Sequence, residues 1–276
     1  MNVIKLKKKL EEFFLEDLGE LDISSQTIFG EKSRGEAVIL AKEEGVFAGA
    51  NVIEIGYSLF QSDIKVNLKK QDGDLLQKGD IIAEIEGPVA VILSGERVIL
   101  NLLQRMSGIA TLTNKAVHLL GSNTTRICDT RKTSPGLRMF EKYAVRCGGG
   151  FNHRFGLYDG VMIKDNHIAF SGSITNAVNK VRESTGHMVK VEVEIETEEQ
   201  LLEAIDSGAD VIMFDNRSPE EVARFAEITP KHIISEASGG IGLHNLADYR
   251  HTNVDYISLG MLTHSYKSLD ISLNVK

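Results

Sequence analysis

Residues 189–215 read Val-Lys-Val-Glu-Val-Glu-Ile-Glu-Thr-Glu-Glu-Gln-Leu-Leu-Glu-Ala-Ile-Asp-Ser-Gly-Ala-Asp-Val-Ile-Met-Phe-Asp, and they carry the signals for a strand, a helix and a second strand in succession. Apolar and charged residues alternate over 189–194, which is typical of a strand with two different faces. Thr197-Glu-Glu-Gln200 is a capping box that begins a helix, and Gly208 ends it. Val211–Phe214 is a short apolar run that indicates a buried strand. The stretch therefore predicts one β–α–β unit with parallel strands.

The same alternation continues on both sides of this unit. A second capping box, Ser218-Pro-Glu-Glu221, begins another helix. Charged or glycine residues follow nearly every strand, whereas a doubly wound sheet would gather its site at one switch point, so a barrel is favoured. Residues 111–267 are too few for eight β/α units, which need about 250 residues, so an incomplete barrel of six or seven strands is expected. The expected strands are Thr125–Cys128, Gly160–Ile163, Val189–Val193, Val211–Phe214, Ile233–Ser235 and Tyr256–Leu259.

The first 110 residues have a different pattern and predict a separate small α/β domain. Residues 35–49 indicate a strand and a turn, and residues 51–60 have helical spacing. Residues 71–87 alternate short strands with glycine turns, which resembles the hammerhead pattern of biotinyl and lipoyl carrier domains. The segment lacks a lysine at a hairpin tip, so a covalently carried cofactor is not expected.

Composition excludes several classes of protein. No apolar run approaches the roughly 18 residues of a membrane span, and the N-terminus has charge where a signal peptide is apolar. Two cysteines, Cys128 and Cys147, are too few for a disulfide framework, so a reduced, cytoplasmic protein is expected. The net charge of −8 argues against nucleic-acid binding, which needs a large basic surface.

Positive charge is nevertheless concentrated in one part of the chain. Between Arg131 and Lys164, seven basic side chains stand against two acidic ones. Arginine presents a planar fork of donors that suits carboxylates, and lysine is a compact charge. The cluster Arg131, Lys132, His153, Arg154 and Lys164 therefore predicts a site for a small, highly charged anion. The alternative is a solvated face of salt bridges.

Two further groups follow the expected strands. Glu194 and Asp215 are suited to Mg²⁺ shared with substrate phosphates, or to ribose hydroxyls. Ordinary exposed strand ends and an acid–base pair of the glycosidase type are the alternatives. Glycine-rich backbone at 238–240 and 258–264 follows the last two strands, where barrels commonly bind phosphate. The three groups together predict a site for a carboxylated anion and a phosphorylated sugar.

A set of motifs runs through nearly the whole chain: Gln104–Thr111, Asp129–Thr133, Pro135–Arg138, Glu141–Val145, Gly148–Gly150, Asn152–Arg154, Gly156–Leu157, Ile163–His167, Glu236–Ile241 and Leu262–His264. In combination they resemble the quinolinate phosphoribosyltransferase family, from about Glu16 to Ser272. The resemblance implies an N-terminal α/β sandwich (1–110) and an incomplete seven-stranded α/β barrel (111–267), with the tail 268–276 returning to the first domain. It also implies a Mg²⁺-dependent homodimer with an active site shared across the interface. The implied reaction converts quinolinate and phosphoribosyl pyrophosphate to nicotinate mononucleotide, pyrophosphate and CO₂ in NAD biosynthesis.

The resemblance assigns roles to individual residues. The carboxylates of quinolinate are bound by Arg131, His153, Arg154 and Lys164, and Arg105 comes from the partner subunit. The implied catalytic residues are Lys132, Lys164, Glu194 and Asp215, of which the two carboxylates also bind Mg²⁺ and ribose hydroxyls. The further substrate-binding candidates, most of them for the 5′-phosphate, are Thr133, Ser238, Gly239, Gly240, Gly260 and His264.

Two other classes of protein fit part of the pattern. Lys164 at a strand end could form a Schiff base, as in class I aldolases, and trapping with borohydride would reveal it. A non-catalytic anion sensor is the other alternative, but such a sensor gains nothing from Glu194 and Asp215.

Overall fold

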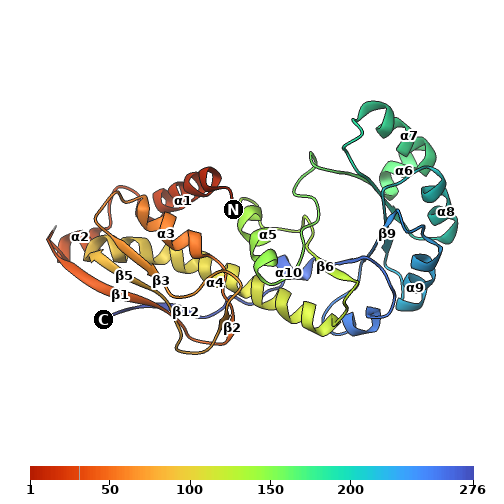
Figure 1. Ribbon diagram of the computed structural model, residues 1–276. Coiled ribbons are helices and arrows are strands. Elements are labelled where there is room, and N and C mark those ends of the chain that lie inside the picture. The colour runs from red at the N-terminus through yellow and green to blue at the C-terminus, as the bar shows by residue number, and fades with distance from the viewer. Residues whose placement is uncertain (31) are drawn as a thin grey trace. The chain divides into compact units, whose positions relative to one another are not determined.

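The computed structural model describes residues 1–30 and 32–276 (Figure 1). These residues form two compact units, each built from separate segments of the chain. The first comprises 1–114, 135–149 and 265–276, and the second comprises 115–134 and 150–264. The first unit thus includes residues 135–149, which lie beyond the boundary at 110 that the sequence suggests. In the part of the chain that the structure describes, no helix is both long enough and apolar enough to cross a membrane.

An antiparallel sheet forms the centre of the first unit. Its strand order is β12-β1-β5-β3, and a separate pair is formed by β2 and β4. The tail strand β12 pairs with β1 from Ala37↔Val275 to Ala41↔Ile271. The strand bounds are β1 (Arg34–Ala41), β2 (Gly45–Val46), β3 (Lys65–Leu68), β4 (Leu75–Leu76), β5 (Ile81–Pro88) and β12 (Ile271–Val275).

The helices of the first unit have apolar faces that turn inward. In α1 the side chains of Leu6, Leu10 and Phe14 recur at helical spacing and are buried. The helix expected over 51–60 is confirmed as α3. The helix expected from Ser94 begins earlier and extends over α4, which continues into the second unit. The bounds are α1 (Val3–Leu18), α2 (Ile23–Ile28), α3 (Ala50–Ser58), α4 (Val89–Leu120) and α5 (Arg138–Cys147).

Gly108 in α4 lets the tail approach the helix backbone closely, and we expect Gly108→Ala to destabilise the protein. A Cβ atom at this position would collide with the carbonyl oxygen of Lys267 and would lie 3.0 Å from the Cα of Ser268. Because these atoms belong to backbone, they cannot move aside as a side-chain tip can. Overpacking of this kind costs about 1–3 kcal/mol, which corresponds to a Tm lower by roughly 3–10 °C. Thermal unfolding measures the effect.

Gly186→Ala is the control for this prediction, because a Cβ there meets nothing within 4 Å. Its Tm should stay close to that of the parent protein. An unchanged Tm for Gly108→Ala would show that the tail does not hold the position seen here.

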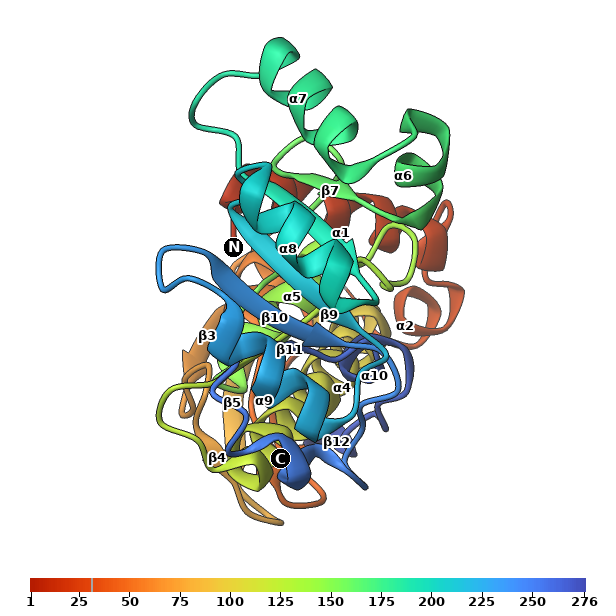
Figure 2. The same cartoon turned by 90° about the vertical axis from the view of Figure 1, so that its right-hand side faces the viewer.

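The second unit is a parallel sheet of six strands in the order β6-β11-β10-β9-β8-β7. Helices α8 and α9 lie along its outer face (Figures 1 and 2). Both predicted capping boxes are present, at Thr197 with Gln200 and at Ser218 with Glu221. The strand bounds are β6 (Arg126–Cys128), β7 (Val161–Ile163), β8 (Val191–Ile195), β9 (Val211–Asp215), β10 (Ile234–Ser238) and β11 (Tyr256–Ser258). The helix bounds are α6 (Asp165–Ser171), α7 (Ile174–Ser184), α8 (Glu198–Asp206), α9 (Pro219–Ile228), η1 (Leu246–Tyr249) and α10 (Met261–His264).

The expected parallel α/β architecture is confirmed, but six strands form this sheet where the family resemblance implies seven. A single residue, Phe151, occupies the remaining place through a parallel bridge to Cys128. Its N–H donates to the Ile127 carbonyl at 2.8 Å, and its carbonyl accepts from the N–H of Asp129 at 3.1 Å. Three glycines directly precede Phe151 and irregular backbone with bends follows it, so the pairing stays at one residue. The sheet is therefore an open one, with β7 and Phe151 at its two ends.

Candidate active site

The second unit has a cleft of about 560 Å³ at the carboxyl ends of its parallel strands. This edge is where ligands bind in parallel α/β folds. Cationic, acidic and glycine residues share the cleft, as the sequence predicts. The lining residues are Thr130, Arg131, Lys132, His153, Arg154, Met162, Lys164, Glu194, Met213, Asp215, Asn216, Ser238, Gly239, Gly240 and Ser258.

Lys164 and Glu194 form an ion pair across the ends of β7 and β8. The Lys164 Nζ atom lies 2.5 Å from a carboxylate oxygen of Glu194. The Glu194 side chain is 15% exposed and that of Lys164 is 44% exposed, so the lysine can reach a ligand while it keeps this partner. The pair therefore places a positive and a negative charge side by side at the wall of the cleft.

Arg154 is held by the loop that precedes β7. Its Nη1 donates to the carbonyl of Gly160 at 2.8 Å, whereas its buried Nε has no hydrogen-bond partner among the described residues. Burial, together with the neighbouring charge of Arg131, lowers the pKa of Arg154. A guanidinium that is partly desolvated, and close to a second one, is stabilised by an anion. The pair Arg131 and Arg154 is therefore suited to an anion.

Asp129 organises the backbone of the same loop. Its carboxylate is fully buried and accepts from Asn152 Nδ2 at 2.6 Å and from the His153 N–H at 2.9 Å. These two bonds hold the loop that contains His153 and Arg154 close to the end of β6.

Lys132 is positioned by the segment that follows β11. Its carbonyl accepts from the Thr263 hydroxyl at 2.7 Å, and a Cβ on Gly260 would lie 3.0 Å from its Cδ. The same added atom would lie 3.2 Å from His264 Nε2. Gly260 and His264 thus lie beside Lys132, although neither lines the cleft among the described residues.

Two other predicted residues also lie outside the set that lines the cleft within the described chain: Thr133 and Arg105. Thr133 follows the cationic pair directly in sequence. Arg105 belongs to the first unit, where its Nε donates to the buried carboxylate of Glu141 at 3.0 Å. Its guanidinium also lies 4.9 Å from the centroid of the Tyr266 ring. No partner chain is present, so its expected role in a second subunit stays a prediction.

Sequence reasoning missed several residues of the cleft wall. Met162 and Met213 each precede a predicted site residue by two positions, so strand alternation places them on the same face as Lys164 and Asp215. The sequence indicates a role for Asn216 less clearly than for the two methionines. Its Nδ2 donates to Asp215 Oδ2 at 2.6 Å, and its own backbone has a positive φ of 53°. The remaining missed residue is Thr130, whereas Ser258 begins the glycine-rich segment 258–264 that the sequence predicts for phosphate.

Comparison with known proteins agrees with this geometry. The model of the quinolinate phosphoribosyl transferase N-terminal domain matches residues 22–107, and that of the C-terminal domain matches residues 109–274. The probable nicotinate-nucleotide pyrophosphorylase (carboxylating) of Bacillus subtilis (strain 168) is 62% identical over 275 residues, which cover 100% of this chain and 95% of the relative.

Two solved structures are similar over their whole length. The crystal structure of NadC from Streptococcus pyogenes has a TM-score of 0.95 at 40% identity and covers 100% of this chain and 99% of its own. The nicotinate-nucleotide pyrophosphorylase of Francisella tularensis has a TM-score of 0.93 at 36% identity, with coverage of 100% and 98%. The chain therefore belongs to the quinolinate phosphoribosyltransferase family.

Proposed function

We infer that this protein is a decarboxylating quinolinate phosphoribosyltransferase, which makes nicotinate mononucleotide, pyrophosphate and CO₂ from quinolinate and phosphoribosyl pyrophosphate. One observation carries the inference: a single cleft joins the arginines, the Lys164–Glu194 pair, Asp215 and the Gly239–Gly240 backbone. The arginines suit a dicarboxylate, and the lysines, carboxylates and glycine backbone suit a phosphorylated sugar. Family membership supports the same reaction. The product makes the enzyme part of NAD biosynthesis.

The reaction needs two bond changes that these charges favour. The ring nitrogen of quinolinate forms a bond to the anomeric carbon as the bond to pyrophosphate breaks, and positive charge develops on the sugar. Lys132 and Lys164 stabilise the departing pyrophosphate, and Glu194 and Asp215 stabilise the cationic sugar. The bond from C2 to its carboxylate then breaks, and its electron pair stays on C2. The adjacent cationic nitrogen stabilises that pair until C2 takes up a proton.

The donor set fits Mg²⁺ as the metal of this site. Glu194 and Asp215 offer carboxylate oxygens, which Mg²⁺ prefers, and two protein ligands are the usual number when substrate phosphates provide others. Bound Mg²⁺ neutralises phosphate charge and orients the leaving group. Glu194 would hold it while also accepting from Lys164.

Turnover by the purified protein tests the proposal. With quinolinate, phosphoribosyl pyrophosphate and Mg²⁺, we expect nicotinate mononucleotide and CO₂ in equal amounts. A chelator should abolish both products, and added Mg²⁺ should restore them. Absence of turnover by folded protein would overturn the proposed function, and turnover in the presence of chelator would overturn the role of Mg²⁺.

We further propose that the enzyme acts as a homodimer in the cytoplasm. The low cysteine content, two residues in the whole chain, is in keeping with a reducing compartment. The implied transfer of Arg105 into the site of a second subunit supports the dimer.

Mixing two inactive variants tests the shared site. Arg105→Ala and Arg154→Ala subunits should each be nearly inactive, because each lacks one guanidinium for the dicarboxylate. In a mixed dimer of C₂ symmetry one of the two sites regains both arginines, so random exchange should restore about a quarter of the parent activity. Product formation after mixing measures the recovery.

The control mixture combines Arg131→Ala with Arg154→Ala, which both alter the wall of one cleft. No exchange can rebuild a complete site in this mixture, so activity should stay at the background. Because Arg105 also binds the buried Glu141, the Tm of Arg105→Ala must be checked first. Equal recovery in both mixtures, or in neither after confirmed exchange, would contradict a shared site.

A further inference from the structure

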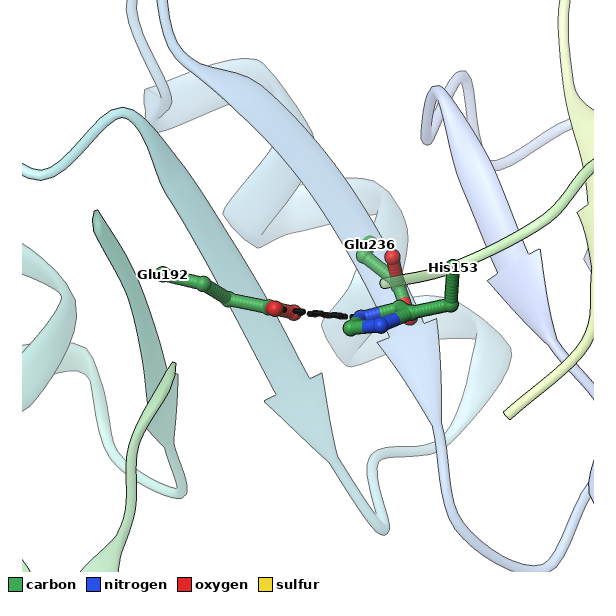
Figure 3. Close-up of side chains that lie close together, drawn as sticks. All are labelled: His153, Glu192 and Glu236. Carbon is green, nitrogen blue, oxygen red and sulfur yellow. Dashed lines mark hydrogen bonds and ion pairs between the residues drawn. The ribbon is translucent and has the colours of Figure 1, made fainter. Parts of the chain in front are cut away.

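Three titratable side chains converge on the inner face of the parallel sheet: His153, Glu192 and Glu236 (Figure 3). Glu192 precedes Glu194 by two residues, so it lies one step of alternation deeper in the same strand. The side chains are 13%, 8% and 5% exposed, respectively. His153 Nε2 lies 3.0 Å from Glu192 Oε2 and 3.7 Å from Glu236 Oε1. The buried carboxylates thus face the side of His153 that points away from solvent.

The hydrogen bonds of the ring define where its proton lies. His153 Nδ1 accepts the backbone N–H of Arg154 at 2.9 Å, so Nδ1 carries a lone pair. The single proton of a neutral imidazole is then on Nε2, which donates to Glu192. A second proton would set an N–H of the ring against the N–H of Arg154. The hydrogen bonds therefore favour the neutral, Nε2-protonated form.

Glu236 does not compete for the ring proton. Its Oε1 has no hydrogen-bond partner among the described residues. Burial and then the charge of Glu192 raise the pKa of Glu236 to about 7. Its Oε1 lies 3.7 Å from His153 Nε2, beyond hydrogen-bond distance, whereas Glu192 lies 3.0 Å away and is the acceptor for His153.

A divalent cation is the other occupant that these three groups could hold. A metal bound to His153 Nε2 would require the ring proton to move to Nδ1, as in most metal-binding histidines. That proton would face the N–H of Arg154. The position of this one backbone donor therefore favours a proton over a metal ion.

We propose that Glu192 is a positioning residue, which holds His153 in the Nε2-protonated form so that Nδ1 fixes the backbone of Arg154 and aims its guanidinium into the cleft. Arg154 is held at its backbone by His153 and at Nη1 by Gly160. This proposal rests on the proposed function, because the aimed guanidinium would bind a carboxylate of quinolinate.

Kinetics of three variants test the proposal. Glu192→Leu removes the acceptor, and we expect the KM for quinolinate to rise about tenfold or more, with kcat and the KM for phosphoribosyl pyrophosphate changed less than about threefold. Glu192→Gln keeps an oxygen that can accept, so it should recover much of the loss. Glu236→Gln alters the carboxyl that lies 3.7 Å from Nε2, beyond hydrogen-bond distance, and serves as the matched control, with a much smaller change in the quinolinate KM than Glu192→Leu.

Nitrogen NMR of the full-length protein labelled at histidine provides a readout that does not depend on turnover. The signal of His153, identified by its loss in His153→Gln, should show a neutral ring protonated at Nε2, and Glu192→Leu should mix the two tautomers. A doubly protonated or Nδ1-protonated ring, a metal ion bound to His153 Nε2, or an unchanged quinolinate KM in Glu192→Leu would overturn the proposal. An inactive parent enzyme would instead overturn the proposed function, and the NMR result would still decide the tautomer.

Discussion

Lys164→Met should lower kcat/KM for the phosphoribosyl donor by about 10²–10³-fold, which is the usual effect of removing one preorganised electrostatic contact. The lysine stands at the end of β7 with its Nζ 2.5 Å from Glu194 and with nearly half of its side chain exposed to the cleft. Methionine keeps the length and apolar stem but removes the charge that opposes the departing pyrophosphate. The ion pair is partly buried on the Glu194 side and open on the Lys164 side, so its loss should cost about 1 kcal/mol and lower the Tm by only a few degrees.

Lys164→Arg separates two explanations for this loss. If positive charge is what the reaction needs, arginine should retain much more activity than methionine. If Lys164 formed a Schiff base, as in an aldolase, both variants would be inactive and borohydride would trap the substrate on the parent enzyme. Lys180→Met, in the exposed part of α7, is the control and should behave like the parent. Full activity of Lys164→Met would remove this lysine from the mechanism.

Gly239→Ala should damage both stability and activity. Gly239 has a φ of +83°, and an added Cβ would collide with Oδ1 of Asn216 and lie 2.8 Å from its backbone nitrogen. Asn216 in turn donates to Asp215 at 2.6 Å. The strained backbone costs about 1–3 kcal/mol, which lowers the Tm by roughly 3–10 °C. Displacement of Asp215 should reduce kcat/KM at least tenfold, since a displacement of about 1 Å costs up to 10²-fold.

Gly240→Ala separates the effect of the steric collision with Asn216 from the cost of placing alanine at a positive φ. This glycine also has a positive φ of +64°, but a Cβ would meet only Asn216 Oδ1, at 4.0 Å. We therefore expect a similar conformational cost and a much smaller loss of activity. Thermal unfolding and steady-state kinetics on both variants measure the two contributions. Equal kinetic losses would mean that Asn216 does not transmit the change to Asp215.

Local signals in the sequence predicted most of the parallel sheet. The capping boxes at Thr197 and Ser218 involve residues only three positions apart, so a short stretch of sequence is enough to predict them. Alternation over 189–194 likewise predicted a strand with two different faces, since its period depends only on the strand itself. The single bridge at Phe151 was not predictable in this way, because its pairing depends on the distant Cys128.

The parts of the site that escaped prediction depend on contacts between distant residues. Asn216 matters because Gly239, directly after the next strand, leaves space for it. His153 meets Glu192 and Glu236 only because the pairing of β8, β9 and β10 brings both glutamates to one face, with Glu236 level with Glu194 and Glu192 one alternation step before it. Neither relation has a signature in a short stretch of sequence. Motif resemblance supplied the candidate residues, but only the structure shows which of them touch one another.

The pairing of β12 with β1 has a consequence for how the chain is made. The two strands stand near opposite ends of the described chain, and the whole second unit is synthesised between them. Until β12 emerges from the ribosome, one edge of β1 exposes unpaired N–H and C=O groups, which is a template for intermolecular association. Nascent chains are therefore most vulnerable to aggregation late in translation, at a stage when the cleft can already be complete.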